Sequence, residues 1–533
     1  MTKTSEIVAG SSNAAYNRFL LLVAGLGGLL YGIDIGIIDP ALGYLGKTIS
    51  MTEENKSVIV AAVLGGSMFA SVIAGFFADI LGRKVMMLIS AVMFVASVAI
   101  IFTSQTYEPL LLGRILQGMS GGVIAVVVPL YLAESLKADA RGKGTSIFQF
   151  MLTFGIVVAT FIGDHYTKNA EAAVEQAAGN QEAIVAAANH AWRGMFLSVI
   201  YPGILFLLGG FFISESPRWL YRKGRSEQAR TAMLRSRTAS ETDLELAELE
   251  TSLAHEHAKP KVSLDESFAE IFTQRKYVVP FIIACVILGC NQATGINSIL
   301  GFMTTILQQA GLAAEAASQS GLWIKILNCV MTVVAVMLVD KKGRKFLLKL
   351  GTGGIIISLL AGSAVFYSFE SKHVDVAEKV RSHIVGDKLT LDLTTTDLGK
   401  IVEPGQPLQI LRANAGPVPT KQTGILVAVC LALFITFFSV GPGVCVWLAL
   451  SELMPTRIRS VGMGVALLIN QGVATGIAAF FLPIVGNYGY FAMFGFWAGC
   501  TIIYFITAAF FLPETKGKTL EEIEEHFAGK RSS

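Results

Sequence analysis

The sequence predicts an all-α membrane protein, in which twelve transmembrane helices form two pseudo-symmetric six-helix bundles with a cytoplasmic helical segment between them. Composition is the first observation behind this fold class: 53% of the 533 residues are hydrophobic and only 15% are charged, whereas soluble domains carry about 25% charged residues. The other two are the number of long apolar runs and a repeat between the halves. Together they exclude a disordered chain, a disulfide scaffold and most soluble enzymes.

Twelve apolar runs are long enough to cross a bilayer, whose hydrocarbon core takes about 20 residues of helix. Six lie near 18–39, 57–78, 85–104, 109–133, 144–163 and 194–214. Six more lie near 276–310, 320–339, 346–368, 423–450, 459–485 and 489–512. We therefore expect an N-terminal bundle (1–214), a cytoplasmic helical linker (215–275), a C-terminal bundle (276–512) and a cytoplasmic tail (513–533).

Lysines and arginines in the short loops predict the orientation, because they are enriched on the cytoplasmic side. One side carries twelve of them: Arg83, Lys84, Lys137, Arg141, Lys143, Lys341, Lys342, Arg344, Lys345, Lys349, Arg457 and Arg459. The other side carries four: Lys47, Lys56, Lys168 and Arg193. We expect the first side to be cytoplasmic, with both termini, and the protein to lie in the plasma membrane, which is the inner membrane of a bacterium.

The two halves repeat a loop motif. The loop after the second run reads Asp79-Ile-Leu-Gly82-Arg83-Lys84, and 261 residues later the loop after the eighth reads Asp340-Lys-Lys-Gly343-Arg344-Lys345. The fourth run ends with Glu134 and Arg141, and 318 residues later the tenth ends with Glu452 and Arg459. The larger second offset predicts an insertion outside the membrane at about 370–422. Two repeated halves are typical of transporters that rock two bundles about a midplane site.

The charged residues of these loops have a physical use. Arginines can pair with carboxylates on neighbouring helix ends and close the cytoplasmic side, and the pairs must break when a cavity opens inward. A static loop anchor is the alternative. The expected gate residues are Asp79, Arg83, Glu134, Arg141, Asp340, Arg344, Glu452 and Arg459.

Charged side chains within the apolar runs are costly and are therefore functional candidates. Asp34 in the first run and Arg114 in the fourth are natural partners across the first bundle, and a permanently charged structural pair is the alternative. Lys325 in the eighth run either snorkels outward or lines the outer cavity. Asp39, near the outer end of the first run, is expected to be wetted. No histidine lies in any run, which excludes a histidine proton relay.

Eight motifs carry a resemblance to a known family. In the first half they are Gly75-x3-Asp79-x2-Gly82-Arg83-Lys84, Gly113-Arg114, Glu134 with Arg141-Gly142, and Glu215-Ser-Pro-Arg218. In the second half they are Gln292-Ala-Thr-Gly295-Ile-Asn297, Asp340-x2-Gly343-Arg344, Gly441-Pro-Gly443 with Trp447, and Pro513-Glu-Thr-Lys-Gly517. In this order they resemble the sugar porter family of the major facilitator superfamily, which includes bacterial sugar–proton symporters and facilitative glucose carriers. The resemblance implies alternating access, a monosaccharide substrate and a monomer, and it adds Glu215 and Arg218 to the cytoplasmic gate.

The resemblance also implies a sugar site. The matching contact positions are Gln149, Asn291, Gln292, Asn297, Asn328, Trp447 and Asn470. Their chemistry agrees, because amides donate and accept hydrogen bonds as the hydroxyls of a neutral sugar do. Buried amides without partners cost free energy, so a cluster of them at lipid depth implies a polar ligand. Amides that only hold helices together are the alternative.

Some positions depart from the family. Gln471, which we also expect to contact the sugar, stands where the family often has Trp, and Asn291 stands where it usually has a first Gln. Gly301 and Phe302 stand where it often has two Tyr. We expect Phe302 to act as the outer-gate aromatic and Gly295 to break the seventh run. These departures leave the identity of the sugar open.

The predicted function is a proton-coupled importer of a hexose or a pentose. Proton-coupled members of the family carry Asp at the position of Asp34, where many passive carriers have Asn, and a passive uniporter of the same fold is the alternative. A transporter-like nutrient sensor would need a longer cytoplasmic tail than 513–533. No phosphate-binding loop, metal-spaced His and Cys set or nucleophile elbow occurs. We therefore expect no enzymatic activity, no cofactor, no metal and no nucleic acid, with sugar, proton and lipid bilayer as the partners.

Overall fold

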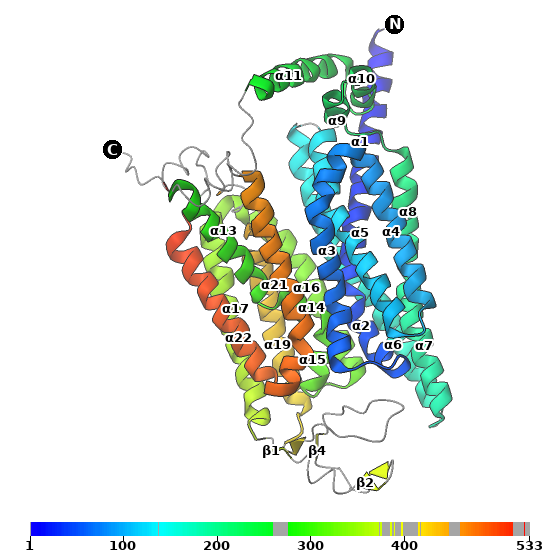
Figure 1. Ribbon diagram of the computed structural model, residues 1–533, viewed down its shortest axis with the longest axis vertical. Helices are drawn as coiled ribbons and strands as arrows, with labels where there is room; N and C mark the ends of the chain where they lie inside the picture. Colours follow the sequence, from blue (N-terminus) through cyan, green and yellow to red (C-terminus); the bar gives the residue numbers. More distant parts are fainter. Residues whose placement is uncertain are drawn as a thin grey trace.

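The computed structural model describes residues 2–136, 138–177, 179–258, 275–372, 417–446, 453, 459–514 and 527, and short strands between 374 and 415. Twelve helical segments in these ranges are long and apolar enough to cross a membrane, from Asn13–Gly36 to Tyr490–Phe511. They form two bundles side by side, one coloured blue to cyan and one green to red (Figure 1). The predicted all-α fold class is confirmed.

The N-terminal bundle owes its tight packing to small residues. Its elements are α1 (Thr2–Gly36), α2 (Ile38–Thr48), α3 (Glu53–Leu81), α4 (Arg83–Thr103), α5 (Tyr107–Ser135), α6 (Ala138–Gln176), α7 (Gln181–Ser198) and α8 (Ile200–Phe212). Gly28, Gly32 and Gly36 follow one face of α1, where α1 packs on α6. A Cβ on Gly32 would overlap the backbone carbonyl of Leu152. Glycine therefore lets the two backbones touch, as is common between membrane helices.

Three short helices follow the first bundle and dock onto one of its ends. They are α9 (Pro217–Arg222), α10 (Ser226–Leu234) and α11 (Ala239–Ala258). The Trp219 indole N–H donates to the Asp79 carbonyl over 2.9 Å, and an Arg237 guanidinium N–H donates to the Ser135 carbonyl over 3.1 Å. We call the end of the molecule that carries these helices the linker face (Figure 1).

The C-terminal bundle contains one broken helix. Its elements are α13 (Arg275–Ala293), α14 (Ile296–Gly301), α15 (Met303–Gln309), α16 (Ala314–Lys342), α17 (Arg344–Glu370), α19 (Lys421–Phe438), η1 (Ser439–Gly443), α21 (Arg459–Tyr488), α22 (Tyr490–Ile506) and η2 (Thr507–Phe511). Gly295 separates α13 from α14 with a φ of 87°, a left-handed conformation that glycine adopts without steric cost. The predicted break in the seventh run is therefore present.

Among the described residues, five two-residue strands lie at the opposite end of the molecule. They are β1 (Val374–Asp375), β2 (Ile384–Val385), β3 (Lys388–Leu389), β4 (Thr396–Asp397) and β5 (Asn414–Ala415). The antiparallel order is β1-β5-β4 in one sheet and β2-β3 in the other, with Val374 opposite Ala415 and Ile384 opposite Leu389. All five fall within 370–422, and we call this end the strand face (Figure 1).

The fifth and sixth helical segments are longer than the apolar runs that predicted them. Helix α6 continues to Gln176 and α7 begins at Gln181, because polar helix-forming residues extend the helices beyond the apolar part. Arg193, which we had assigned to a loop, lies inside α7. Its guanidinium donates to the carbonyls of Phe102 and Ser104 and ties α7 to the end of α4.

The two bundles are pressed together in the half of the molecule nearer the strand face. Helix α3 packs along α21, where Ala61, Leu64, Ala474 and Ala478 form a buried apolar cluster. The Ser57 hydroxyl accepts a hydrogen bond from the Leu482 backbone N–H over 3.0 Å. The ribbons of the two bundles converge in this half (Figure 1).

Candidate functional site

A buried ion pair lies in the centre of the N-terminal bundle. Asp34 on α1 and Arg114 on α5 are both almost fully buried, and an Arg114 Nη1 lies 3.4 Å from Asp34 Oδ1. The same nitrogen donates a shorter hydrogen bond, of 2.7 Å, to the Gln117 side-chain oxygen. Among the described residues, Asp34 Oδ2 has no hydrogen-bond partner. The expected pair is therefore formed, but it satisfies the carboxylate only in part.

The described surroundings of Asp34 leave its carboxylate incompletely hydrogen-bonded. A buried carboxylate oxygen without a partner is costly, and protonation converts the group into a neutral hydrogen-bond donor. Gly121 allows the close approach of α5 to α1, because a Cβ there would lie 2.9 Å from the Tyr31 ring and 3.3 Å from Asp34 Oδ2.

No group of three His, Cys, Asp or Glu able to hold a metal ion occurs in the described part of the chain.

Amide side chains of the C-terminal bundle form a hydrogen-bonded chain across the helix break. Asn297 Nδ2 donates to Gln292 Oε1 over 2.7 Å, and Gln292 Nε2 donates to Asn470 Oδ1 over 3.1 Å. The chain ends where Asn470 Nδ2 donates to the Leu288 carbonyl over 3.0 Å. It thus joins α13, α14 and α21 around Gly295.

The predicted sugar-contact residues differ in exposure. Asn291, Asn328 and Asn470 are buried, with 3%, 7% and 1% exposure. Asn291 Nδ2 donates to the Pro442 carbonyl over 3.3 Å, and Asn328 Oδ1 accepts from the Ser439 hydroxyl over 2.7 Å. The half-buried members are Gln149, Gln292, Asn297 and Gln471. The half-buried amides are partly accessible, whereas the buried ones are hydrogen-bonded to neighbouring helices.

Gln149 comes from the N-terminal bundle and lies on the face of α6 that meets α16. It lies four residues before Thr153 on α6, so both side chains share one face of the helix. The Thr153 hydroxyl contacts Cys329 Sγ on α16 over 3.7 Å, and Cys329 adjoins Asn328. The junction of α6 and α16 therefore brings predicted contact residues of the two bundles together.

Aromatic rings pack on the strand-face side of the helix break. Phe302 is fully buried between α14 and α15, and its ring centroid lies 4.6 Å from that of Phe481. Phe481 in turn stacks on Trp497, with centroids 5.7 Å apart and planes within 4°. The Trp497 ring lies against Gly295, where an added Cβ would overlap it. The expected outer-gate aromatic is thus connected to the helix break through two stacked rings, Phe481 and Trp497.

A buried arginine organises the linker face of the N-terminal bundle. Arg83 is 1% exposed. Its Nε lies 2.8 Å from Glu134 Oε2, its Nη2 lies 2.8 Å from Asp79 Oδ1, and its Nη1 donates to the Ala78 carbonyl. Asp79, Arg83 and Glu134, three of the expected gate residues, therefore lie in contact.

Two glutamates cap helices at equivalent positions of the two halves. Glu215 accepts hydrogen bonds from the backbone N–H groups of Arg83 and Lys84 at the start of α4, and Glu514 does the same for Arg344 and Lys345 at the start of α17. The preceding glycines of the two loops have φ values of 99° and 86°, and a Cβ on either would meet the carboxylate. Burial raises the pKa of the Glu215 carboxyl, while its backbone N–H partners oppose the shift. Sequence reasoning missed Glu514, although the paired motifs contained the signal.

A family model described as "Sugar (and other) transporter" matches residues 20–385 and 408–527, which is most of the chain. The chain belongs to this family. It is a multi-pass membrane protein of sugar transport and not an enzyme.

Individual relatives agree with this membership. The transporter is 29% identical over 514 residues to the glucose transporter GlcP of Staphylococcus epidermidis, covering 95% of this chain and 97% of the relative. It is 27% identical over 519 residues to the galactose-proton symporter of Escherichia coli K12, covering 97% and 96%. Its fold is similar to a partially occluded inward-open structure of the xylose transporter XylE from E. coli, with a TM-score of 0.71, 21% identity and coverage of 95% and 100%.

Several predicted site residues of the transporter lie outside the described residues or have side chains that do. Trp447 and Glu452 are outside them. Arg141, Asp340 and Arg459 lie in α6, α16 and α21, but their side chains are not described. Arg218 is half-buried at the first turn of α9. The gate and sugar-contact roles of these residues stay predictions.

Two expectations for Lys325 and Asp39 were wrong. Lys325 does not snorkel outward and Asp39 is not wetted: the two side chains are 0% and 1% exposed and form an ion pair of 2.7 Å. The reason is that each side chain meets the other bundle, a contact that hydropathy along one helix cannot reveal. That Lys325 lines an outer cavity concerns a conformation open at the strand face and stays a prediction.

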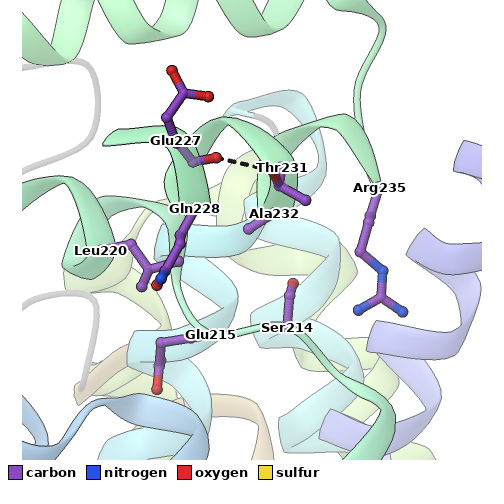
Figure 2. A pocket seen from close by; sticks show the side chains of 8 residues that line it. All are labelled: Ser214, Glu215, Leu220, Glu227, Gln228, Thr231, Ala232 and Arg235. Atoms are coloured by element: carbon purple, nitrogen blue, oxygen red, sulfur yellow. Dashed lines mark hydrogen bonds between the residues drawn. The ribbon is translucent and has the colours of Figure 1, made fainter. Parts of the chain in front are cut away.

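A pocket of about 390 Å³ lies at the linker face of the transporter. Its walls come from α9, α10 and the loop before them, and its lining residues are Ser214, Glu215, Leu220, Glu227, Gln228, Thr231, Ala232 and Arg235 (Figure 2). None of the half-buried amides and neither member of the Asp34–Arg114 pair lines it. It is therefore a hollow of the docked linker, separate from the amide chain.

Proposed function

We propose that the transporter imports a monosaccharide, a hexose or a pentose, together with a proton by alternating access. The observation that carries this proposal is the buried Asp34 carboxylate. Its Oδ1 lies 3.4 Å from Arg114 Nη1, and its Oδ2 has no hydrogen-bond partner among the described residues. The names of relatives support it, since they include a galactose-proton symporter and an arabinose-proton symporter.

The half-buried amides supply the chemistry for the sugar. Gln292 and Asn297 can exchange their mutual hydrogen bond for bonds to sugar hydroxyls, because an amide offers both donors and acceptors. Gln149 reaches the same region from the N-terminal bundle. A sugar that contacts both bundles binds tightly only in certain relative positions of the bundles, as transport by rocking bundles requires.

Asp34 supplies the coupling. A proton entering from the strand face neutralises the carboxylate and removes its attraction to Arg114, which then keeps its shorter bond to Gln117. Loss of that pair frees α1 to move relative to α5, and the proton leaves toward the linker face after the bundles have rocked. The sugar and the proton thus cross in one cycle.

We assign the linker face to the cytoplasm, because it carries the Arg83 and Arg344 loops and the excess of basic residues. Both termini and the helices α9 to α11 then lie inside, and the strands face outward. The remaining gate residues, the four-part division of the chain, the plasma-membrane location and a monomeric state belong to the same proposal.

A passive uniporter is the second candidate, and the contact between Arg114 and Asp34 favours it if the carboxylate stays charged throughout. Uptake of labelled glucose, galactose, xylose and arabinose into proteoliposomes distinguishes the two. We expect accumulation above equilibrium only when the outside is more acidic, and its loss on addition of a protonophore. Equilibration without any effect of pH would support the uniporter, and absence of uptake of every sugar would refute both.

A further inference from the structure

A second fully buried ion pair joins the two bundles, and the proposed coupling and sugar site make no use of it. Asp39 lies in the first turn of α2, and Lys325 lies on α16, 286 residues further along the chain. Lys325 Nζ is 2.7 Å from Asp39 Oδ2, and the side chains are 0% and 1% exposed. The pair therefore spans the boundary between the bundles with no access to water.

The Asp39 carboxylate is also bound by the half of the broken helix that follows Phe302. The backbone N–H of Thr304 on α15 donates to Asp39 Oδ1 over 2.8 Å. The Thr304 hydroxyl lies 3.1 Å from Asp39 Oδ2. One side chain of the N-terminal bundle thus holds two separate helices of the other bundle.

The position of these helices relates the contact to opening of the strand face. Helix α15 packs against α2, and both lie in the half of the molecule nearer the strand face (Figure 1). A path from the strand face to the amide chain requires α2 to separate from α15 and α16. That separation must break every contact of the Asp39 carboxylate with the other bundle.

The energetics make such a contact two-state. A bare buried ion pair gives little net stability because both charges lose their hydration, and parting the charges in a dry environment is strongly unfavourable. Here the Thr304 N–H and hydroxyl add two charge-assisted hydrogen bonds to the Asp39 carboxylate, and these stabilise the closed arrangement beyond the ion pair itself. Asp39 and Lys325 are therefore either paired and dry or separated and hydrated. The second condition is met only when water enters between the bundles.

We propose that Asp39, Lys325 and Thr304 form a latch that holds the transporter closed on its strand face, and that opening this face breaks the latch. The inference rests on the alternating access proposed above and adds the residues that set the balance between its end states. Removing both charges should shift the population toward the conformation that is open at the strand face.

A native cysteine, Cys329, can report this opening. Cys329 lies four residues after Lys325 on α16, so the two share one face of the helix. Its Sγ contacts Thr153 of the N-terminal bundle over 3.7 Å, and the residue is buried. A membrane-impermeant thiol reagent applied from the strand face reaches Cys329 only when the bundles part there.

The test measures the rate of Cys329 modification in oriented proteoliposomes, with the other five cysteines replaced by alanine. Asp39→Asn combined with Lys325→Met should raise the rate from the strand face by roughly fivefold or more, the lower end of usual coupling between sites. Lys325→Arg keeps the charge and should stay near the parent rate. The matched control is Glu53→Gln with Lys56→Met, which removes a 2.6 Å ion pair within α3 and should change nothing.

Thr304→Val provides a second variant that leaves no charge unpaired, in case the double variant does not fold. It should raise the rate by a smaller factor, because it removes only the hydroxyl contact. Parent-like rates in folded Thr304→Val and in the folded double variant would overturn the proposal, as would an equal increase in the α3 control. The assay uses no sugar and no pH gradient, so its failure is distinguishable from failure of the proposed transport.

Discussion

Removal of Gln292 tests the sugar site at its centre. The side chain accepts from Asn297 and donates to Asn470, so Gln292→Ala breaks both bonds. Asn470 keeps its bond to the Leu288 carbonyl, and the half-buried Asn297 can turn to water. At about 1 kcal/mol of net stability per hydrogen bond, the variant should lose about 2 kcal/mol and still fold.

The loss in sugar affinity should be of the same size as the loss in stability. Leaving a bound sugar hydroxyl without its partner costs about 1–3 kcal/mol, which corresponds to a Kd weakened by about 5- to 150-fold. Calorimetric titration of the purified protein with the transported sugar measures this change, and thermal unfolding of the same sample checks the fold.

Gln308→Ala is the matched control, because it removes the same side chain from an exposed position on α15. Its Kd should equal that of the parent protein. Parent-like affinity in Gln292→Ala, and likewise in Gln149→Ala and Asn297→Ala, would refute the assignment of the amides to the sugar.

Three further predictions concern the framework. Gly295→Ala should lower the free energy of unfolding by at least about 1–3 kcal/mol, the usual cost of a left-handed non-glycine residue, because the added Cβ also overlaps the Trp497 ring. Gly499→Ala, with nothing within 4 Å of the added Cβ, should not. Equal melting temperatures would contradict the account of the break. Glu514→Gln should weaken the cap of α17 and lower the free energy of unfolding by about 1 kcal/mol, and an unchanged free energy of unfolding would show that the cap does not stabilise the helix. A cysteine placed in 370–422 should react with an impermeant thiol reagent in intact cells and one placed in 225–260 should not, and the reverse pattern would overturn the orientation.

Features set by local sequence were predictable. The twelve spans follow from hydropathy, and the equivalence of the two loops follows from their repeated residues. The break at Gly295 was expected from the resemblance of the motif from Gln292 to Asn297 to that of the family. Each depends on short stretches of sequence rather than on contacts between distant helices.

Features set by contacts between distant helices were not predictable. The Asp39–Lys325 pair joins residues 286 positions apart, and nothing in either helix indicates the other. The division of the amides into half-buried and buried ones depends on how α21 and η1 pack, as the bond from Asn291 to the Pro442 carbonyl shows. The length of α6 and α7 was missed because polar residues continue a helix without raising its hydropathy.

Proton uptake driven by sugar, compared between the parent protein and Asp34→Asn, tests the central claim most directly. One charge moving through about 150 mV supplies roughly 3.5 kcal/mol, enough for a sugar gradient of a few hundred-fold at about 1.4 kcal/mol per tenfold. Asp34→Asn is a permanent mimic of the protonated carboxyl, so it should bind sugar and exchange it downhill. It should neither alkalinise the medium when sugar is added nor accumulate sugar under a pH gradient. Full sugar-driven proton uptake by Asp34→Asn would show that the proton is carried elsewhere and would contradict the account.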